Sequence, residues 1–404
     1  MLAEQKRLTS LEIEKVCYAR HAIVIYCLVF AIFLSDWKLP LGVSFSDLMA
    51  VVIAALTFFD IKKLRMGQLG FIFILLGIVF ANSFIQMQIN PFFSFNTLIV
   101  YTAKLLVYSF SLCSAFNVIR DNSLEKKLFS VISILTLIVL IISLYIYIVQ
   151  TFRLSLPYEF FWKFTRMDRA SYTFRGSSLI RMRGLSSEPA YFGGVLSLIL
   201  AINYFNSYGF RFRRSIEILL LICSILSFSF SVLPIVVMIV FLNLYQKYQL
   251  TFLKEKWFIF AVIGIIGIII LLYDKFATAF FQRFIAIVNS QDGSASSRLF
   301  GSWAYIDHPF AGNGIGQTPA IWNNYAYVLS DLGIAPFFLS VMATLFLCRK
   351  NIFFGIFLIV ISFQKGGYLF YYYWVLIFLL IIFSRNDSGN PRCSIQPSKL
   401  SENV

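Results

Sequence analysis

Charged side chains are scarce in this 404-residue chain: Asp, Glu, Lys and Arg together make up 13% of it, against roughly 25% in soluble globular proteins. A soluble fold is therefore not expected. The six cysteines fall within expected helices, at the ends of helices or in the C-terminal tail, and none pairs at metal-ligand spacing, so the sequence favours neither a metal site nor a disulfide framework. No Asp-x-Asp pair and no His/Cys cluster suggests a metal, and no cofactor is predicted.

Two further signals are missing. The first 20 residues carry charges of both signs, and no small-residue cleavage site follows the first apolar run, so no cleavable signal peptide is expected. The sequence also shows no internal repeat, which argues against a transporter built from inverted repeats.

Hydrophobic residues make up 59% of the chain. Apolar runs long enough to cross a bilayer must satisfy their own backbone groups, so they indicate helices. The expected fold is all-α, a polytopic transmembrane bundle of about 11–12 helices in a single domain covering 1–404. The expected helices are 17–34, 43–59, 69–85, 98–116, 128–149, 191–208, 216–229, 234–246, 257–273, 325–347, 352–363 and 368–383. Pro234 predicts the break between the helices at 216–229 and 234–246.

Positive charge is in excess, with a formal net charge of +15. In a membrane protein this excess sets topology, and no nucleic-acid partner is expected. Most lysines and arginines fall in alternate loops, which places both termini in the cytoplasm. Two long outer loops are then expected at 150–190 and 274–324, and a disordered cytoplasmic tail at 384–404.

The first long loop is rich in arginine on the side where basic residues are disfavoured, including Arg175, Arg181 and Arg183. The planar guanidinium suits phosphate oxygens, so the loop predicts an anion site; contact with anionic lipid headgroups is the alternative. Pro189 is expected in the first turn of a helix, with Ser186 or Ser187 as its N-cap.

Glu188 precedes that proline. It could stabilise the helix N-terminus, orient an arginine, or accept a proton from a hydroxyl, and the sequence leaves these roles open.

The second long loop contains Arg298, the expected partner for the anion site, and then His308 ahead of a run with glycine at every second position, Gly312, Gly314 and Gly316. No strand–turn–helix context supports a nucleotide fingerprint here. The glycines either allow a ligand to approach the backbone or form a tight turn. His308 could carry a proton near neutral pH or serve the structure only.

These two loops carry a family resemblance. The pattern RxRGLxxEPxxxG, from Arg181 to Gly193, resembles the Arg-Gly…Glu-Pro motif of O-antigen polymerases (Wzy). The second-loop pattern, from Ser297-Arg298 through HPxxGxGxG to NNYxxxLxxxG ending at Gly333, is similar to a signature shared by O-antigen polymerases and ligases. Ligases carry a catalytic histidine where this chain has Asn323, which favours the polymerase.

The resemblance implies a glycosyltransferase of lipopolysaccharide biosynthesis in the bacterial inner membrane. It would move a growing glycan from undecaprenyl pyrophosphate onto a new lipid-linked repeat unit at the periplasmic face. The implied catalytic residues are Arg183, Glu188 and Arg298. The residues implied in substrate binding are Arg175, Arg181, Ser187, His308, Gly312, Gly314 and Gly316. A chain-length regulator protein is a further candidate partner.

Other functions remain open at this stage. An O-antigen ligase is one, and a lipid-linked oligosaccharide flippase or transporter is another. A transporter would carry charged residues within its helices, where this sequence offers chiefly Asp47 and Lys104. Lys104 is expected to snorkel or to meet a polar partner inside the bundle.

Overall fold

The computed structural model describes residues 19–58, 64–91, 93–168, 172–173, 180–249, 285, 289, 301–319, 321–365 and 367–384. These residues form helices and no named strand. An N-terminal helix, Ala19–Phe33, precedes the labelled elements. The α-helices that follow are α2 (Phe45–Thr57), α3 (Met66–Ile89), α4 (Phe95–Asp121), α5 (Glu125–Thr151), α6 (Pro189–Phe205), α7 (Arg214–Leu226), α8 (Leu233–Tyr248), α12 (Asn324–Leu332), α13 (Ile334–Lys350), α14 (Ile352–Lys365) and α15 (Tyr371–Ser384).

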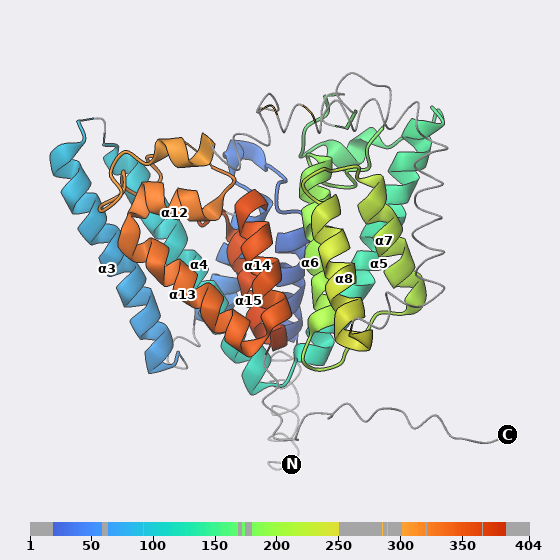
Figure 1. Ribbon diagram of the computed structural model, residues 1–404, viewed down its shortest axis with the longest axis horizontal. Helices are drawn as coiled ribbons and strands as arrows, with labels where there is room; N and C mark the ends of the chain where they lie inside the picture. Colours follow the sequence, from blue (N-terminus) through green and yellow to red (C-terminus); the bar gives the residue numbers. More distant parts are fainter. Residues whose placement is uncertain are drawn as a thin grey trace, which may run out of the picture.

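The helices run roughly side by side, so the connections gather at two ends of the bundle (Figure 1). The segment between α5 and α6 and the short helix α12 lie at one end, drawn at the top. The turn between α4 and α5 and the end of α15 lie at the other. The described parts of both predicted long loops therefore share one end of the molecule.

Burial differs sharply between helices. Nearly every side chain of α6 is buried, and α15 is similarly enclosed, which places both at the centre of the bundle. The 24-residue helix α3 buries only Ile72, Val79, Ser83 and Gln86. Its remaining faces expose large apolar side chains such as Phe73 and Phe84. An apolar helix exposed on most of its circumference is typical of a lipid-facing position.

Three helices, α3, α4 and α5, are long and apolar enough to cross a membrane, and several shorter apolar helices accompany them. The described part of the chain is thus all-helical and compatible with a helical membrane protein. The expected break near Pro234 is confirmed: α7 ends at Leu226, α8 begins at Leu233, and Pro234 lies in the first turn of α8.

The expected single helix over 325–347 is wrong. Gly333 divides it into α12 and α13 because its φ of +79° lies outside the helical region. A β-carbon at Gly333 would come within 2.3 Å of the Phe310 carbonyl oxygen, so the break is also a close backbone contact. The helix expected over 257–273, nearly all of the second loop before residue 301, and the tail after Ser384 lie outside the described residues.

Lys104 meets a polar partner within the bundle, as the sequence allowed. Its Nζ lies 2.9 Å from Oδ2 of Asp47, which joins α4 to α2. The hydroxyl of Tyr108, one turn further along α4, donates to the other oxygen of the same carboxylate. The two charges expected inside helices therefore pair with each other.

Candidate functional site

The segment Ile180–Glu188 leads directly into the buried helix α6. The helix begins at Pro189, which confirms its expected first-turn position. The N-cap is Glu188, with an extended backbone and no side-chain capping bond, so the expectation of a serine N-cap is wrong. The backbone N–H of Ser187 donates instead to Oδ2 of Asp36, at 2.6 Å. The carboxylate of Asp36, and not a serine hydroxyl, therefore accepts a hydrogen bond from the backbone just before α6.

Two tryptophans anchor the same segment through their indole N–H groups. Trp162 donates to the carbonyl of Gly184 at 2.9 Å, and Trp37 donates to the carbonyl of Leu185 at 2.8 Å. Gly184 adopts φ +53°, and a β-carbon there would lie 2.4 Å from Oγ of Ser143. The turn therefore requires glycine both for its backbone conformation and for its packing.

Arg183 is the most deeply placed charge of the segment, with 1% of its surface exposed. Its guanidinium carbon lies 3.5 Å from the centroid of the Trp162 ring. Nη1 donates to the carbonyl of Ser187 at 2.8 Å, and Nη2 donates to the carbonyl of Arg166 at 2.5 Å. Burial lowers the pKa of Arg183 to about 10, so the side chain is still a cation at neutral pH. Arg183 therefore links two backbone segments, one at Ser187 and one at Arg166.

The guanidinium that reaches the surface beside Glu188 belongs to Arg166. Its Nη1 lies 2.9 Å from Oε1 of Glu188, and about half of the arginine side chain is exposed. Nε and Nη2 each lie 3.1 Å from a carboxylate oxygen of Asp168. Hydrogen bonding to Arg166 lowers the pKa of the Asp168 carboxyl. The predicted carboxylate therefore faces an arginine, but a different one from Arg183.

Of the other predicted residues of the first loop, Ser187 and Arg181 are described and Arg175 is not. Ser187 contributes backbone groups, to Asp36 and to Arg183. Arg181 donates its backbone N–H to the carbonyl of Tyr172 at 2.7 Å. Arg175 lies outside the described residues, as does Arg298 from the second loop.

The glycine run of the second loop folds against α12. The N–H of Gly314 donates to the carbonyl of Asp331 at 2.9 Å, and the N–H of Gly316 donates to its carboxylate at the same distance. A β-carbon at Gly312 would lie 2.3 Å from the Asp331 carbonyl oxygen. Of the two interpretations left open, the described contacts match a tight turn. His308 is exposed, and its carbonyl accepts from the Gly312 N–H at 2.7 Å.

Asp331 organises this turn. Its buried carboxylate also accepts from the N–H of Thr318 at 2.9 Å and from the hydroxyl of Tyr368 at 2.7 Å. Together with the Gly316 N–H, three donors converge on one carboxylate. Asp331 ties the loop before α12 to the segment that precedes α15.

A ring contact joins the start of α6 to the second predicted loop. Tyr191, in the first turn of α6, lies against Trp322, with ring centroids 5.6 Å apart. Asn323 follows Trp322 and caps α12, its Oδ1 accepting from the N–H of Tyr325 at 3.1 Å and from that of Ala326 at 3.3 Å. Asn323, the position compared above with a histidine of O-antigen ligases, is thus a helix cap.

Among the described residues, no group of three or more His, Cys, Asp or Glu side chains could hold a metal ion. No protein-family model, no curated protein and no solved structure matches the chain at a significant level.

The sequence did not single out Arg166, Asp36, Trp162 or Asp331. Arg166 was one basic residue among several in an arginine-rich loop. Asp36 and Trp162 act on Ile180–Glu188 from other parts of the chain, and no local pattern marks such contacts. For Asp331 a weak signal existed, because a lone acid in the first third of the apolar helix expected over 325–347 needs polar partners.

Proposed function

We propose that the protein is an integral membrane glycosyltransferase that polymerises polysaccharide repeat units, as in O-antigen synthesis. Its donor would be a glycan on undecaprenyl pyrophosphate, and its acceptor a second lipid-linked repeat unit. The proposal includes about 11–12 membrane spans in the bacterial inner membrane, both termini in the cytoplasm, and the two long loops on the periplasmic side. The family resemblance of the two loop motifs is its starting point.

The observation that carries the proposal is the Arg166–Glu188 ion pair. A half-exposed guanidinium and a carboxylate stand 2.9 Å apart at one end of the bundle, directly before the central helix α6. A guanidinium binds phosphate oxygens through two parallel hydrogen bonds, and a neighbouring carboxylate can orient it or accept a proton. Both functions are needed where a sugar leaves pyrophosphate.

In the proposed reaction, a hydroxyl of the acceptor sugar attacks the anomeric carbon of the donor glycan. The new C–O bond forms as the bond to pyrophosphate breaks, the hydroxyl proton passes to Glu188, and undecaprenyl pyrophosphate leaves with the bonding electrons. Arg166 would stabilise the charge that develops on that leaving group. Arg298 remains the predicted second-loop ligand of the pyrophosphate.

Within this scheme Arg183 is a positioning residue. Its guanidinium donates to the carbonyl of Ser187, the residue before Glu188, and to the carbonyl of Arg166 itself. It would hold the Arg166 backbone against the turn that carries Glu188. His308 and the glycine turn of the second loop would form the opposite wall. The Tyr191–Trp322 contact brings the end of that loop against the first turn of α6.

The test is genetic and begins with deletion of the gene in its own host. Loss of a polymerase leaves lipopolysaccharide capped with single repeat units, whereas loss of a flippase removes the O-antigen. Complementation with Arg166→Gln or Glu188→Gln is expected to leave single repeats, while Lys163→Gln, an exposed lysine of the same loop, should restore the ladder. An unchanged ladder after gene deletion contradicts the proposed function. A full ladder with Arg166→Gln at normal protein level contradicts only the assigned role of Arg166.

A further inference from the structure

One face of α5 is exposed and apolar over much of its length. Its exposed isoleucines lie three, four or seven residues apart and therefore share one side of the helix: Ile134, Ile138, Ile141 and Ile148. Phe152, directly after the helix, continues that spacing. An apolar face of this kind is typical of contact with lipid. The 27 residues of α5 span about 40 Å, more than the roughly 30 Å of a hydrocarbon core, so the last turn of a centred helix reaches the headgroups.

Beyond α5 the chain turns back along this face. The N–H of Leu154 donates to the carbonyl of Val149 at 2.9 Å. The hydroxyl of Tyr145, which lies between two of the exposed isoleucines on the same face, donates to the carbonyl of Pro157 at 2.8 Å. Tyr145 lies six residues before the end of α5. The segment 152–160 is therefore held against the lipid-facing side of the helix, beside its last turns.

The outward side of this segment is apolar as well. Phe152, Leu154, Leu156 and Phe160 each leave 44–70% of their surface exposed. Large apolar side chains exposed so close together form a patch, and such patches mark contact with a membrane or a partner. Since the segment lies on the lipid-facing side of α5, lipid is the partner that its outward side chains meet.

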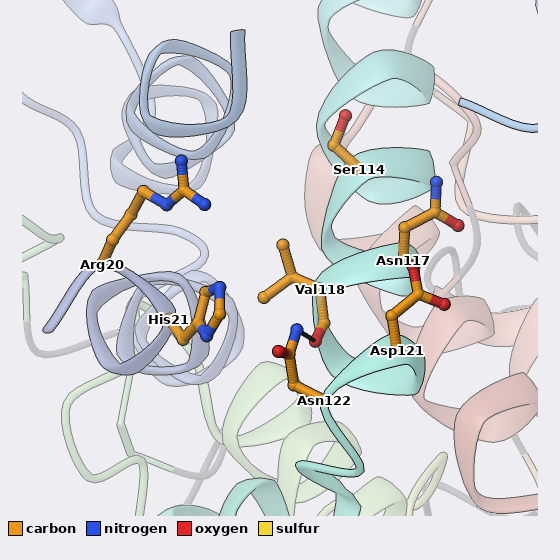
Figure 2. Close-up of a pocket in the computed structure, with 7 residues that line it drawn as sticks. All are labelled: Arg20, His21, Ser114, Asn117, Val118, Asp121 and Asn122. Carbon is orange, nitrogen blue, oxygen red and sulfur yellow. Dashed lines mark hydrogen bonds between the residues drawn. The ribbon is translucent and has the colours of Figure 1, made fainter. Parts of the chain in front are cut away.

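The connection at the other end of α5 is polar instead. Asp121, Asn122 and Ser123, between α4 and α5, are exposed. Asp121 and Asn122 also border a polar cavity of about 220 Å³ between α4 and the N-terminal helix (Figure 2). A turn that meets water is built from such residues. The apolar connection after α5 is therefore expected to be shielded from water.

The depth of the segment in the bilayer is limited by its polar groups. Residues 152–158 lie outside any helix, and most of them are exposed. Non-helical backbone does not face the hydrocarbon core, because its N–H and C=O groups would have no partners there. Arg153 and Glu159 are exposed too, and charged side chains also avoid that core. Apolar and charged side chains in one exposed segment match the interface between headgroups and acyl chains.

We propose that residues 152–160 anchor the protein in the lipid headgroup region at the end of the bundle that carries the Arg166–Glu188 pair. The apolar side chains enter the upper part of the acyl chains, and Arg153 and Glu159 remain among the headgroups. The partner is the surface of the bilayer. The inference rests on the membrane embedding contained in the proposed function and is independent of glycosyl transfer.

The anchor is connected directly to the Arg166–Glu188 pair. Trp162 follows it by two residues and donates its indole N–H to the carbonyl of Gly184, four residues before Glu188. Arg166 follows Trp162 by four residues. The anchor therefore fixes the height of the pair relative to the membrane surface, where the pyrophosphate of a lipid-linked donor lies.

The experiment uses the full-length protein in phospholipid vesicles without substrate, with one fluorescent coumarin amino acid introduced by stop-codon suppression. The coumarin replaces Leu154 or, as a second test position, Leu156. The controls are Ile138, in the middle of α5, and Asp307, an exposed acid of the second loop at the same end of the bundle. The quenchers are a phospholipid with a nitroxide on its headgroup, one with a nitroxide deep in its acyl chain, and iodide on both sides of the membrane.

The headgroup nitroxide should quench the labels at Leu154 and Leu156 most strongly. The acyl-chain nitroxide should quench the label at Ile138 most strongly, and iodide the label at Asp307. Melting temperatures in detergent show whether each labelled protein is folded.

Three results overturn the anchor while Ile138 is still quenched from the acyl chains. These are iodide quenching at Leu154 and Leu156 equal to that at Asp307, quenching at both positions from the deep acyl chain alone, and no quenching there by any agent, which would mean that protein covers the segment. If neither lipid nitroxide quenches the label at Ile138, the membrane embedding in the proposed function fails together with the anchor.

Discussion

Arg183 and Trp162 form the tightest cation–π contact described in the protein, with 3.5 Å between the guanidinium carbon and the ring centroid. The same tryptophan donates its indole N–H to the carbonyl of Gly184. Arg183 in turn donates to two further carbonyls, one of them from Arg166. A buried cation is retained here because the ring and the carbonyls replace its lost hydration.

We expect Arg183→Ala to lower the free energy of unfolding by about 3 kcal/mol, since it removes the ring contact and leaves two carbonyls without their donor. The measurement is thermal unfolding of the purified protein in detergent. Lys163→Ala, from the same end of the bundle but exposed, is the control and should change the melting temperature little. A melting temperature for Arg183→Ala equal to that of the control would show that the contact does not stabilise the protein.

Gly312 and Gly209 form a matched pair for testing the glycine turn. Their φ angles are +71° and +73°, but a β-carbon at Gly312 meets the Asp331 carbonyl oxygen at 2.3 Å, whereas at Gly209 it meets nothing within 4 Å. Alanine at either position costs about 1 kcal/mol for the left-handed backbone. Gly312→Ala should therefore unfold at a clearly lower temperature than Gly209→Ala. An equal fall in melting temperature for the two variants would mean that the loop around Gly312 shifts freely away from α12.

Asp331→Ala removes the acceptor of three hydrogen bonds, from Gly316, Thr318 and Tyr368. Because these donors lie at a buried carboxylate, we expect a loss of about 3–5 kcal/mol in unfolding free energy. Asp307→Ala, an exposed acid nearby, is the control. Limited proteolysis gives a second readout: cleavage within 308–319 should become faster in Asp331→Ala alone. Unchanged proteolysis and stability would show that the Asp331 carboxylate does not hold this loop in place.

The Asp47–Lys104 pair predicts a non-additive double-mutant cycle. Each single change, Asp47→Asn or Lys104→Met, removes one partner of this pair. Because the Lys104 side chain is 35% exposed, we expect a cost of about 1–2 kcal/mol, between those of exposed and buried pairs. The double variant removes both charges and should be more stable than the sum of the two single losses implies. Melting temperatures of the four proteins in one detergent give the coupling. Strict additivity would show that the pair contributes no net interaction.

Much of the helical framework follows from the sequence alone. Apolar runs mark most of the described helices because the hydrophobic pattern of a membrane helix is local and continuous. Proline marked two boundaries correctly, at Pro189 and near Pro234, since its ring excludes it from a helix interior. The sequence did not predict that the helix expected over 325–347 is divided. The positive φ of Gly333 accompanies a close contact with the Phe310 backbone, and no local pattern reveals that contact.

The candidate site divides in the same way. That arginines, Glu188 and a glycine turn are concentrated in two loops is a property of the sequence. Which arginine is buried on Trp162 and which stands exposed beside Glu188 was decided only by the tertiary structure. Guanidinium groups are chemically identical along the chain, and burial, not residue type, separates Arg183 from Arg166. The side chains that set that burial come from other helices and loops.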